Sequence, residues 1–110
     1  MSMNLPSEIF GSVIVVHTPE ELAADQAELF ENYLPTLERD NVVLDLDNTE
    51  ILDSAGLAAL LNTQDTFRSR GGQLKISATN TSNRKILEIT RLDRQIEVFQ
   101  SVIDAVKSVQ

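Results

Sequence analysis

VVLDLDNTEILDSAGLAALL, residues 42–61, is the stretch of sequence that decides the fold. It starts with a short apolar run, Val42–Leu46, which is typical of a buried strand. A run rich in leucine and alanine follows and predicts a helix over 53–70, which the pair Gly71-Gly72 ends. Ser54 lies at the junction between strand and helix. Three roles are open to its hydroxyl: helix cap, nucleophile, or acceptor of a modifying group.

The same two patterns recur on both sides of this stretch. Further strands are predicted at Val13–His17, Leu74–Ser77 and Ile96–Phe99, and further helices over 24–37 (ending or kinking near Leu34 because of Pro35), 80–92 and from Ser101 onward. From residue 42 strands and helices alternate, which favours an α/β fold with a mostly parallel sheet covered by helices. In such sheets, sites form beyond the carboxyl ends of the strands, and Ser54 falls there.

Each of the last three helices has one predicted apolar face. The faces consist of Leu57, Leu60, Leu61, Gln64 and Phe67, then Ile86, Leu87, Ile89 and Leu92, and finally Val102, Ile103, Val106 and Val109. Asn80, Thr81 and Ser82 are candidate caps for the second of these helices, and Ser101 with Asp104 resembles a capping box at the third.

Composition limits the classes of function. The 110 residues fit one domain, 1–110, and the absence of cysteine excludes disulfides and thiolate chemistry. A net charge of −8 repels phosphate backbones, and 5% aromatic residues leave little for base stacking, so we expect no direct nucleic-acid binding. The start, MSMNLPSEIF, does not resemble a signal peptide, and no apolar run is long enough to span a membrane. We therefore expect a cytoplasmic protein.

Either Asp53 or Ser54 could cap the helix; if Ser54 were the cap, its hydroxyl would be occupied and a hydrophobic staple would be lost, so the sequence favours Asp53. With Asp53 as N-cap, Leu52 and Leu57 occupy the two positions of a hydrophobic staple. Ser54 is then the first helical residue, and its hydroxyl is not needed for capping.

Catalysis and metal binding are poorly supported. The only histidine, His17, ends a different strand, and the sequence around Ser54 lacks the first glycine of a nucleophile elbow. We therefore interpret His17 as a partly buried structural residue and expect no enzyme. Asp45, Asp47, Glu50 and Asp53 lack the spacing of a calcium loop, so they are interpreted as solvated loop carboxylates. No glycine-rich phosphate loop is present, and no cofactor is expected.

The acceptor role remains. A phosphoryl group on Ser54 would lie at a helix N-terminus, where backbone N–H groups and the helix dipole favour an anion. Asp53 would oppose it by repulsion between like charges. Ala55 and Gly56 are expected to leave the site open, so that another protein can approach closely.

The stretch 42–61 resembles the signature of the STAS domain, the fold of anti-sigma factor antagonists. The family pattern is an apolar strand, a short connector and Asp-Ser-(Ser/Ala/Thr)-Gly-Leu leading into a helix, and the matching residues here are Asp53-Ser54-Ala55-Gly56-Leu57. The resemblance continues through Gly71-Gly72, QLKIS, NRKILEITRL and IEVFQSVIDAV, and so covers about the whole chain. It implies a STAS-type fold, in which a mostly parallel sheet of four to five strands is flanked by about four helices.

The resemblance also implies a function. Ser54 would be phosphorylated by a partner serine kinase that doubles as an anti-sigma factor, and a serine phosphatase would reset it. The unphosphorylated protein would bind this partner and release the sigma factor. Asp53, Ser54, Ala55, Gly56 and Leu57 are then the expected partner-binding residues.

Two departures from the family pattern matter. The second serine or threonine of many members is Ala55 here, so the acceptor is unambiguous. The early Gly-(Glu/Arg)-Leu-Asp of many members corresponds to Glu20-Glu21-Leu22-Ala23, which lacks the aspartate. An alternative function is a STAS scaffold subunit of a stressosome or a lipid-transport complex, in which Ser54 only starts a helix. The oligomeric state stays open.

Overall fold

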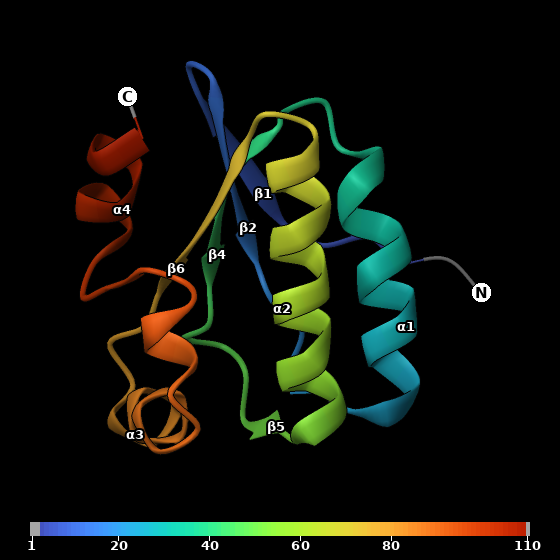
Figure 1. Ribbon diagram of the computed structural model, residues 1–110, viewed down its shortest axis with the longest axis vertical. Coiled ribbons are helices and arrows are strands. Elements are labelled where there is room, and N and C mark those ends of the chain that lie inside the picture. The colour runs from blue at the N-terminus through green and yellow to red at the C-terminus, as the bar shows by residue number, and fades with distance from the viewer. Residues whose placement is uncertain (1–2, 110) are drawn as a thin grey trace.

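The computed structural model describes residues 3–109 as an α/β fold around a five-stranded sheet (Figure 1). The strands are β1 (Ser7–Phe10), β2 (Val13–His17), β4 (Asn41–Asp45), β6 (Gln73–Ser77) and β7 (Val98–Phe99). Their order in the sheet is β1-β2-β4-β6-β7; β2, β4, β6 and β7 run parallel, and β1 pairs with β2 antiparallel. The predicted fold class is confirmed. β1 was not predicted, because its sequence, SEIF, is neither a continuous apolar run nor an alternation of apolar and polar residues; all four residues are exposed.

Two very short strands form a second, separate ladder. β3 (Glu21–Leu22) and β5 (Ile51–Leu52) pair in parallel. Each precedes a long helix, β3 before α1 (Ala24–Tyr33) and β5 before α2 (Ser54–Ser69). This ladder therefore fixes the beginnings of α1 and α2 side by side, and Ser54 lies directly beside it.

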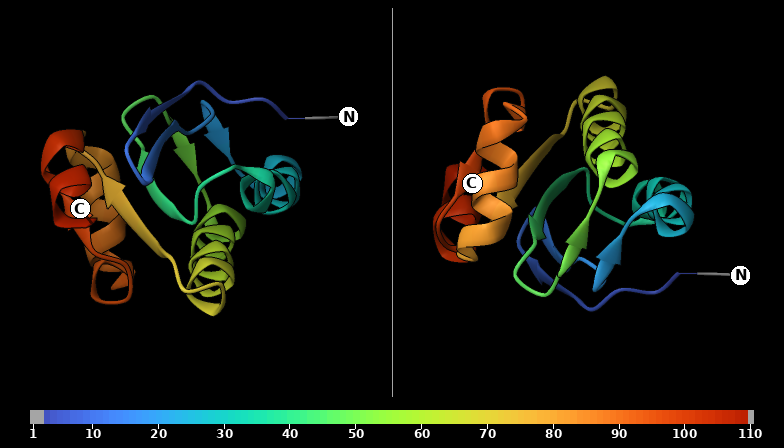
Figure 2. Two further views of the ribbon diagram at one scale, coloured as in Figure 1. Left: turned by 90° about the horizontal axis from the view of Figure 1, so that it is seen from above. Right: turned by 90° about the horizontal axis from the view of Figure 1, so that it is seen from below.

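Helices cover both faces of the sheet (Figure 2). α1 and α2 lie together on one face, α4 (Val102–Val109) lies on the other, and α3 (Thr81–Ile89) lies beyond the carboxyl end of β6. Two 3₁₀ turns, η1 (Leu34–Thr36) and η2 (Leu92–Arg94), follow α1 and α3. Pro35 lies in η1, so the predicted end of the first helix is confirmed. Within residues 3–109, no helix has the length and apolar character needed to cross a bilayer.

Alternating side chains of the central strands divide the core in two. Ile14 and Val16 of β2 join the larger cluster under α1 and α2, where Phe30 and Phe67 are fully buried. Val13 and Val15 of the same strand join a smaller cluster under α4. Both faces of these strands are covered, which explains why they read as continuous apolar runs in the sequence.

The region after α3 differs from the prediction. The helix ends at Ile89 rather than near residue 92, because Arg91 adopts a left-handed backbone conformation with φ 60°. Ile89 is 70% exposed, so its assignment to the apolar face is wrong. β7 contains only Val98 and Phe99, shorter than the predicted strand, although Ile96 is fully buried just before it.

α4 begins as predicted but presents a different face to the sheet. Ser101 Oγ accepts a hydrogen bond from the Asp104 N–H at 3.1 Å, which is one half of the predicted capping box. Ile103 is 66% exposed, and Ala105 is buried in its place. The predicted face is therefore wrong at this residue, because a helix of two turns offers several apolar positions and the sequence alone does not rank them.

Candidate functional site

The first turn of α2 has the geometry that the sequence predicts. Asp53 is the N-cap, with extended backbone angles (φ −104°, ψ −173°), and its Oδ1 accepts a hydrogen bond from the Gly56 N–H at 3.0 Å. The Asp53 carbonyl accepts the first helical bond, from the Leu57 N–H at 2.9 Å. Ser54 is the first helical residue, and it is exposed. Its hydroxyl therefore faces solvent at the start of a helix.

Gly56 is buried, in contrast to the expectation that it leaves the surface open. A Cβ atom at Gly56 would lie 1.9 Å from the carbonyl oxygen of Leu22 and 3.1 Å from Leu52 Cδ1. The first turn of α2 therefore packs against the backbone of β3 at a distance that only glycine permits. Gly56 therefore contributes to the site by letting α2 pack closely against β3. The accessible groups around Ser54 belong to other residues near Ser54.

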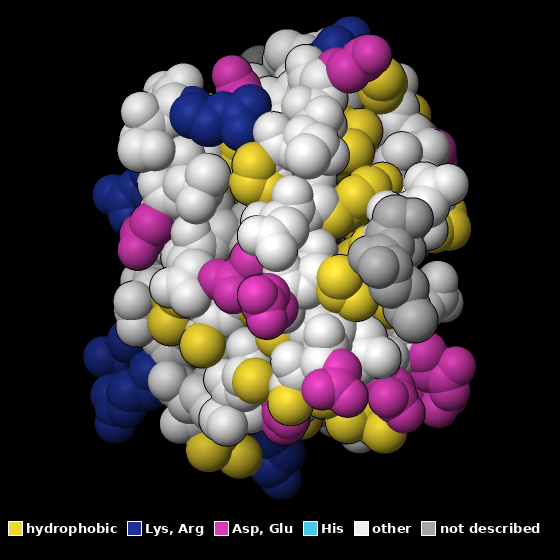
Figure 3. Space-filling model, turned by 90° about the vertical axis from the view of Figure 1, so that its right-hand side faces the viewer, with side chains coloured by type: hydrophobic (Ala, Val, Ile, Leu, Met, Phe, Trp, Pro, Cys, Tyr) yellow, Lys and Arg dark blue, Asp and Glu magenta, His cyan; other side chains and the backbone are white. Residues whose placement is uncertain are grey.

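The surface beside Ser54 is acidic with one apolar side chain. Ile51 is 48% exposed, and the exposed carboxylates Glu50 and Asp53 lie one residue before it and two residues after it in the chain. The Glu20 carbonyl accepts hydrogen bonds from the Glu50 and Ile51 N–H groups at 2.8 and 3.1 Å, which brings the exposed residues 20 and 21 alongside. Figure 3 looks onto the molecule from the side of α1 and shows carboxylates gathered at its lower right.

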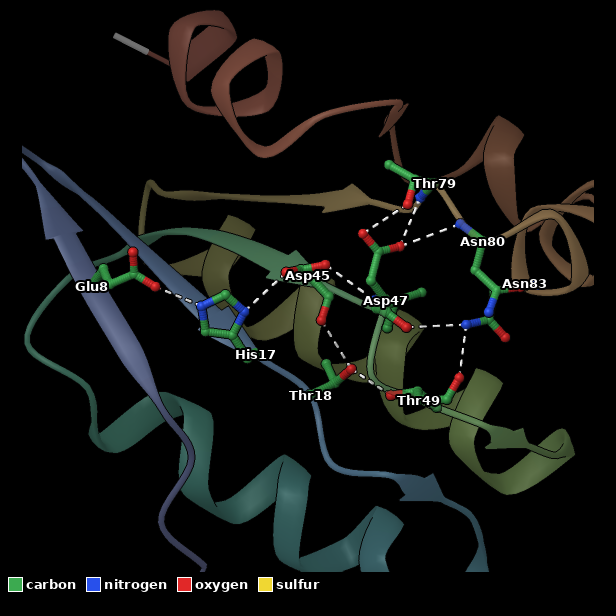
Figure 4. Close-up of polar contacts among 10 residues, drawn as sticks. Glu8, His17, Thr18, Asp45, Asp47, Thr49, Thr79, Asn80 and Asn83 are labelled. Carbon is green, nitrogen blue, oxygen red and sulfur yellow. Dashed lines mark hydrogen bonds and ion pairs between the residues drawn. The ribbon is translucent and has the colours of Figure 1, made fainter.

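His17, at the end of β2, lies between two carboxylates (Figure 4). Its Nε2 is 2.6 Å from Glu8 Oε1, and its Nδ1 is 2.9 Å from Asp45 Oδ2. The hydrogen bond to Glu8 raises the pKa of His17 above its usual value, and Asp45 adds to this while burial opposes it. The ring connects β1, β2 and β4, and His17 is partly buried as predicted, which is consistent with a structural role.

Polar side chains at the carboxyl ends of the strands hold the connector between β4 and β5. Asp47 accepts hydrogen bonds from the Thr79 N–H and hydroxyl at 2.8 and 2.9 Å and from the Asn80 N–H at 3.3 Å. Asn83 is buried, and its Nδ2 donates to the carbonyls of Leu46 and Thr49 at 3.0 and 2.9 Å (Figure 4). These bonds position the segment that leads to Ser54.

The four acidic residues of the connector therefore differ in role. Asp45 binds His17, Asp47 binds the loop before α3, and Asp53 caps α2, whereas Glu50 is exposed. Asp47, Glu50 and Asp53 are exposed, as the interpretation of solvated carboxylates expects, although Asp47 and Asp53 also accept hydrogen bonds. The interpretation is wrong for Asp45, whose side chain is only 13% exposed. Sequence reasoning also missed Asn83. The available signal was a polar residue in the first turn of a helix at the edge where the carboxyl ends of parallel strands meet.

The missing aspartate of the segment Glu20–Ala23 has a structural meaning. Ala23 is the N-cap of α1, with extended backbone angles (φ −136°, ψ −173°), and no side chain caps this helix. The residue that departs from the family pattern, Ala23, is therefore the N-cap of α1.

Comparison with known proteins gives consistent results. The sequence model of the STAS domain matches residues 4–105. A protein of Thermotoga neapolitana, provisionally named an anti-sigma factor antagonist, is 27% identical over 109 residues, which are 96% of each chain. A crystal structure from Thermotoga maritima with the same provisional name has a TM-score of 0.85 at 24% identity, covering 96% of this chain and 93% of the other. An anti-sigma factor antagonist from Mycobacterium paratuberculosis has a TM-score of 0.83 at 23% identity, covering 99% and 98%.

Proposed function

This chain belongs to the STAS domain family, and from that membership we propose that it is an anti-sigma factor antagonist whose docking is controlled by phosphorylation of Ser54. The names of its relatives support the general function. The observation that carries the proposal is the exposed Ser54 at the first position of α2, with its capping role taken by Asp53.

The proposed docking surface is the exposed start of α2. Asp53 and Ser54 face solvent, and Ala55 and Leu57 are half-buried at its edge. Ile51 adds an exposed apolar side chain. Gly56 contributes through the close packing of α2 on β3 rather than through contact with the partner. A partner with a basic rim around an apolar pocket would complement this surface.

Phosphorylation would act on docking more than on folding. A phosphate of about −1.5 to −2 charge at the first turn is favoured by the helix dipole. A partner that covers Ser54 would have to remove water from this charge beside Asp53, and an unpaired charge buried at an interface costs several kcal/mol. The phosphorylated protein would therefore release its partner.

The partners implied by this cycle are a serine protein kinase that is also the anti-sigma factor, and a serine phosphatase that restores Ser54. We propose that the protein acts by binding and not as an enzyme. Both ring nitrogens of its only histidine lie against carboxylates, which leaves that ring no role as a base for Ser54. Because sigma factors act on RNA polymerase, we place the protein in the cytoplasm.

The test is phosphorylation in vitro. The full chain is incubated with ATP and the candidate kinase, whose gene is sought beside that of the protein, and phosphate is located by mass spectrometry. We expect one phosphate on the wild type and none on Ser54→Ala. Ser82→Ala is the matched control, because Ser82 is also an exposed serine in the first turn of a helix and should not matter. Stoichiometric phosphate on Ser54→Ala would refute the assignment of the site, and no phosphate on either protein would favour the scaffold role.

A further inference from the structure

A groove at the far end of α2 carries a second inference. It lies between the C-terminal half of α2, the start of β6 and the segment around η2, and its volume is about 460 Å³. Gln64 and Arg68 line it from α2, Gln73 and Lys75 from β6, and Arg94 from η2. This volume is within the range of pockets that hold small molecules.

The charges in the groove are not balanced. Lys75 Nζ is 2.6 Å from Glu97 Oε1, so this pair is neutral. Arg68 and Arg94 remain, opposed only by Asp93, and within residues 3–109 neither guanidinium makes an ion pair or a hydrogen bond. By contrast, Arg70, outside the groove, contacts Asp40 at 2.6 Å and the Pro35 carbonyl at 2.9 Å.

This positive charge is local to one part of the chain. Residues 1–67 contain 13 acidic residues and one basic residue, whereas residues 68–110 contain four acidic and eight basic residues. The C-terminal segment 68–110 is therefore basic although the whole chain has a net charge of −8, and this segment supplies all the lining residues of the groove except Gln64. An anion attracted to this protein would be directed to that segment.

One residue just outside the groove has a strained backbone. Arg91, with φ 60°, precedes η2, and its carbonyl accepts a hydrogen bond from the Arg94 N–H at 3.2 Å. A left-handed conformation is uncommon outside glycine and tends to persist where it positions a functional group. Here it sets the turn that brings Arg94 to the groove.

We propose that this groove binds a small phosphorylated molecule, with Arg68 and Arg94 holding its phosphate group. Guanidinium groups bind phosphate through paired hydrogen bonds, and both are unoccupied here. The Gln64 side chain, held by a 2.6 Å bond from its Nε2 to the Gln95 carbonyl, and Gln73 offer further polar contacts. Ser54 and Arg68 are separated by about 20 Å along α2, so the ligand would not compete with a partner at Ser54.

The test uses the full chain labelled with ¹⁵N and titrated with inorganic phosphate at constant ionic strength, with succinate as a dicarboxylate comparison. We expect saturable shifts of the Gly72, Gln73 and Gln95 amides with phosphate and weaker ones with succinate. Arg68→Gln/Arg94→Gln should lower the phosphate affinity at least tenfold. Lys85→Gln/Lys107→Gln removes the same charge from exposed sites and should leave the affinity unchanged.

Three results would overturn the proposal: shifts that do not saturate, equal weakening by both double variants, or tighter binding of succinate than of phosphate. None of these results depends on Ser54. A failure of this proposal would therefore leave the proposed phosphorylation of Ser54 untouched, and the reverse also holds.

Discussion

At the scale of single residues, Asp53 and Ser54 have separate tasks at the start of α2. Asp53 satisfies a helix N–H, and Ser54 presents its hydroxyl to solvent. Because the tasks are separate, stability and regulation can be changed independently by substitution of neighbouring residues.

Asp53→Ala should lower the free energy of unfolding by about 1 kcal/mol, because it leaves the Gly56 N–H without its cap. Asp53→Asn retains a capping oxygen and should lose much less, and Ser54→Ala should be close to neutral. Urea unfolding of the three variants measures these differences. Equal losses for Asp53→Ala and Ser54→Ala would show that the cap assignment is wrong.

His17 should make stability depend on pH. Its pKa is raised in the folded protein, mainly by the hydrogen bond to Glu8, with Asp45 assisting. Protonation therefore stabilises the fold: the contribution is fully present below the unfolded pKa, about 6.5, and is lost as the pH rises through the higher folded pKa. We expect the wild type to lose stability relative to His17→Gln between pH 6 and pH 9.

Urea unfolding midpoints of both proteins across this range provide the measurement. Subtracting the variant removes the contributions of the other titrating groups. A difference that stays constant, or grows with pH, would contradict the assigned geometry of Glu8, His17 and Asp45 (Figure 4).

The cap at Asp53 could be predicted because Asp53 and Gly56 lie within one turn of each other in the chain. The partners of Asp47 and Asn83 could not, because Thr79 and Leu46 are more than 30 residues away from them in the chain. Such contacts exist only once parallel strands bring their ends together.

At the scale of elements, the contact between α2 and β3 determines where Ser54 lies. The pattern of apolar residues predicted α2 and the central strands β2, β4 and β6 to within one residue at each end. It did not predict β3 and β5, because two residues carry no periodicity and their pairing is a long-range event.

Gly56→Ala should therefore destabilise the fold by about 2 kcal/mol or more, since the new Cβ would overlap the Leu22 carbonyl and separate α2 from β3. Gly71→Ala is the comparison: it meets no atom within 4 Å and carries only the strain of φ +80°, about 1 kcal/mol. Chemical denaturation ranks the two variants. A larger loss for Gly71→Ala would contradict the close approach of α2 to β3.

Ala23→Asp should stabilise the protein. α1 has no side-chain cap, and an aspartate at its N-cap would accept N–H groups of the first turn, worth about 0.5–2 kcal/mol. Thermal melting of Ala23→Asp and of Ala23→Ser, a second capping residue, tests this expectation. If both variants melt below the wild type, the start of α1 is assigned incorrectly.

At the scale of the whole molecule, the two ends of α2 have opposite character. Its beginning lies on an acidic surface with Ser54 and Ile51, and its end lines a basic groove in the other half of the chain. The family pattern in the sequence pointed to the first end. It could not indicate the second end, because residues from three separate elements form the groove. Only the folded structure shows that Arg68 and Arg94 have no ion-pair partner among the described residues.

The central claim is that a charge at Ser54 weakens docking without disturbing the fold. The most direct measurement is a binding titration of the partner kinase with the wild type, Ser54→Asp and the control Ser82→Asp, together with a melting curve for each. Ser54→Asp should bind at least about tenfold more weakly, a loss of about 1.4 kcal/mol, while its Tm stays within about 3 °C of the wild type. Ser82→Asp should bind like the wild type. Normal binding by Ser54→Asp, or a loss of binding that accompanies unfolding, would contradict this account.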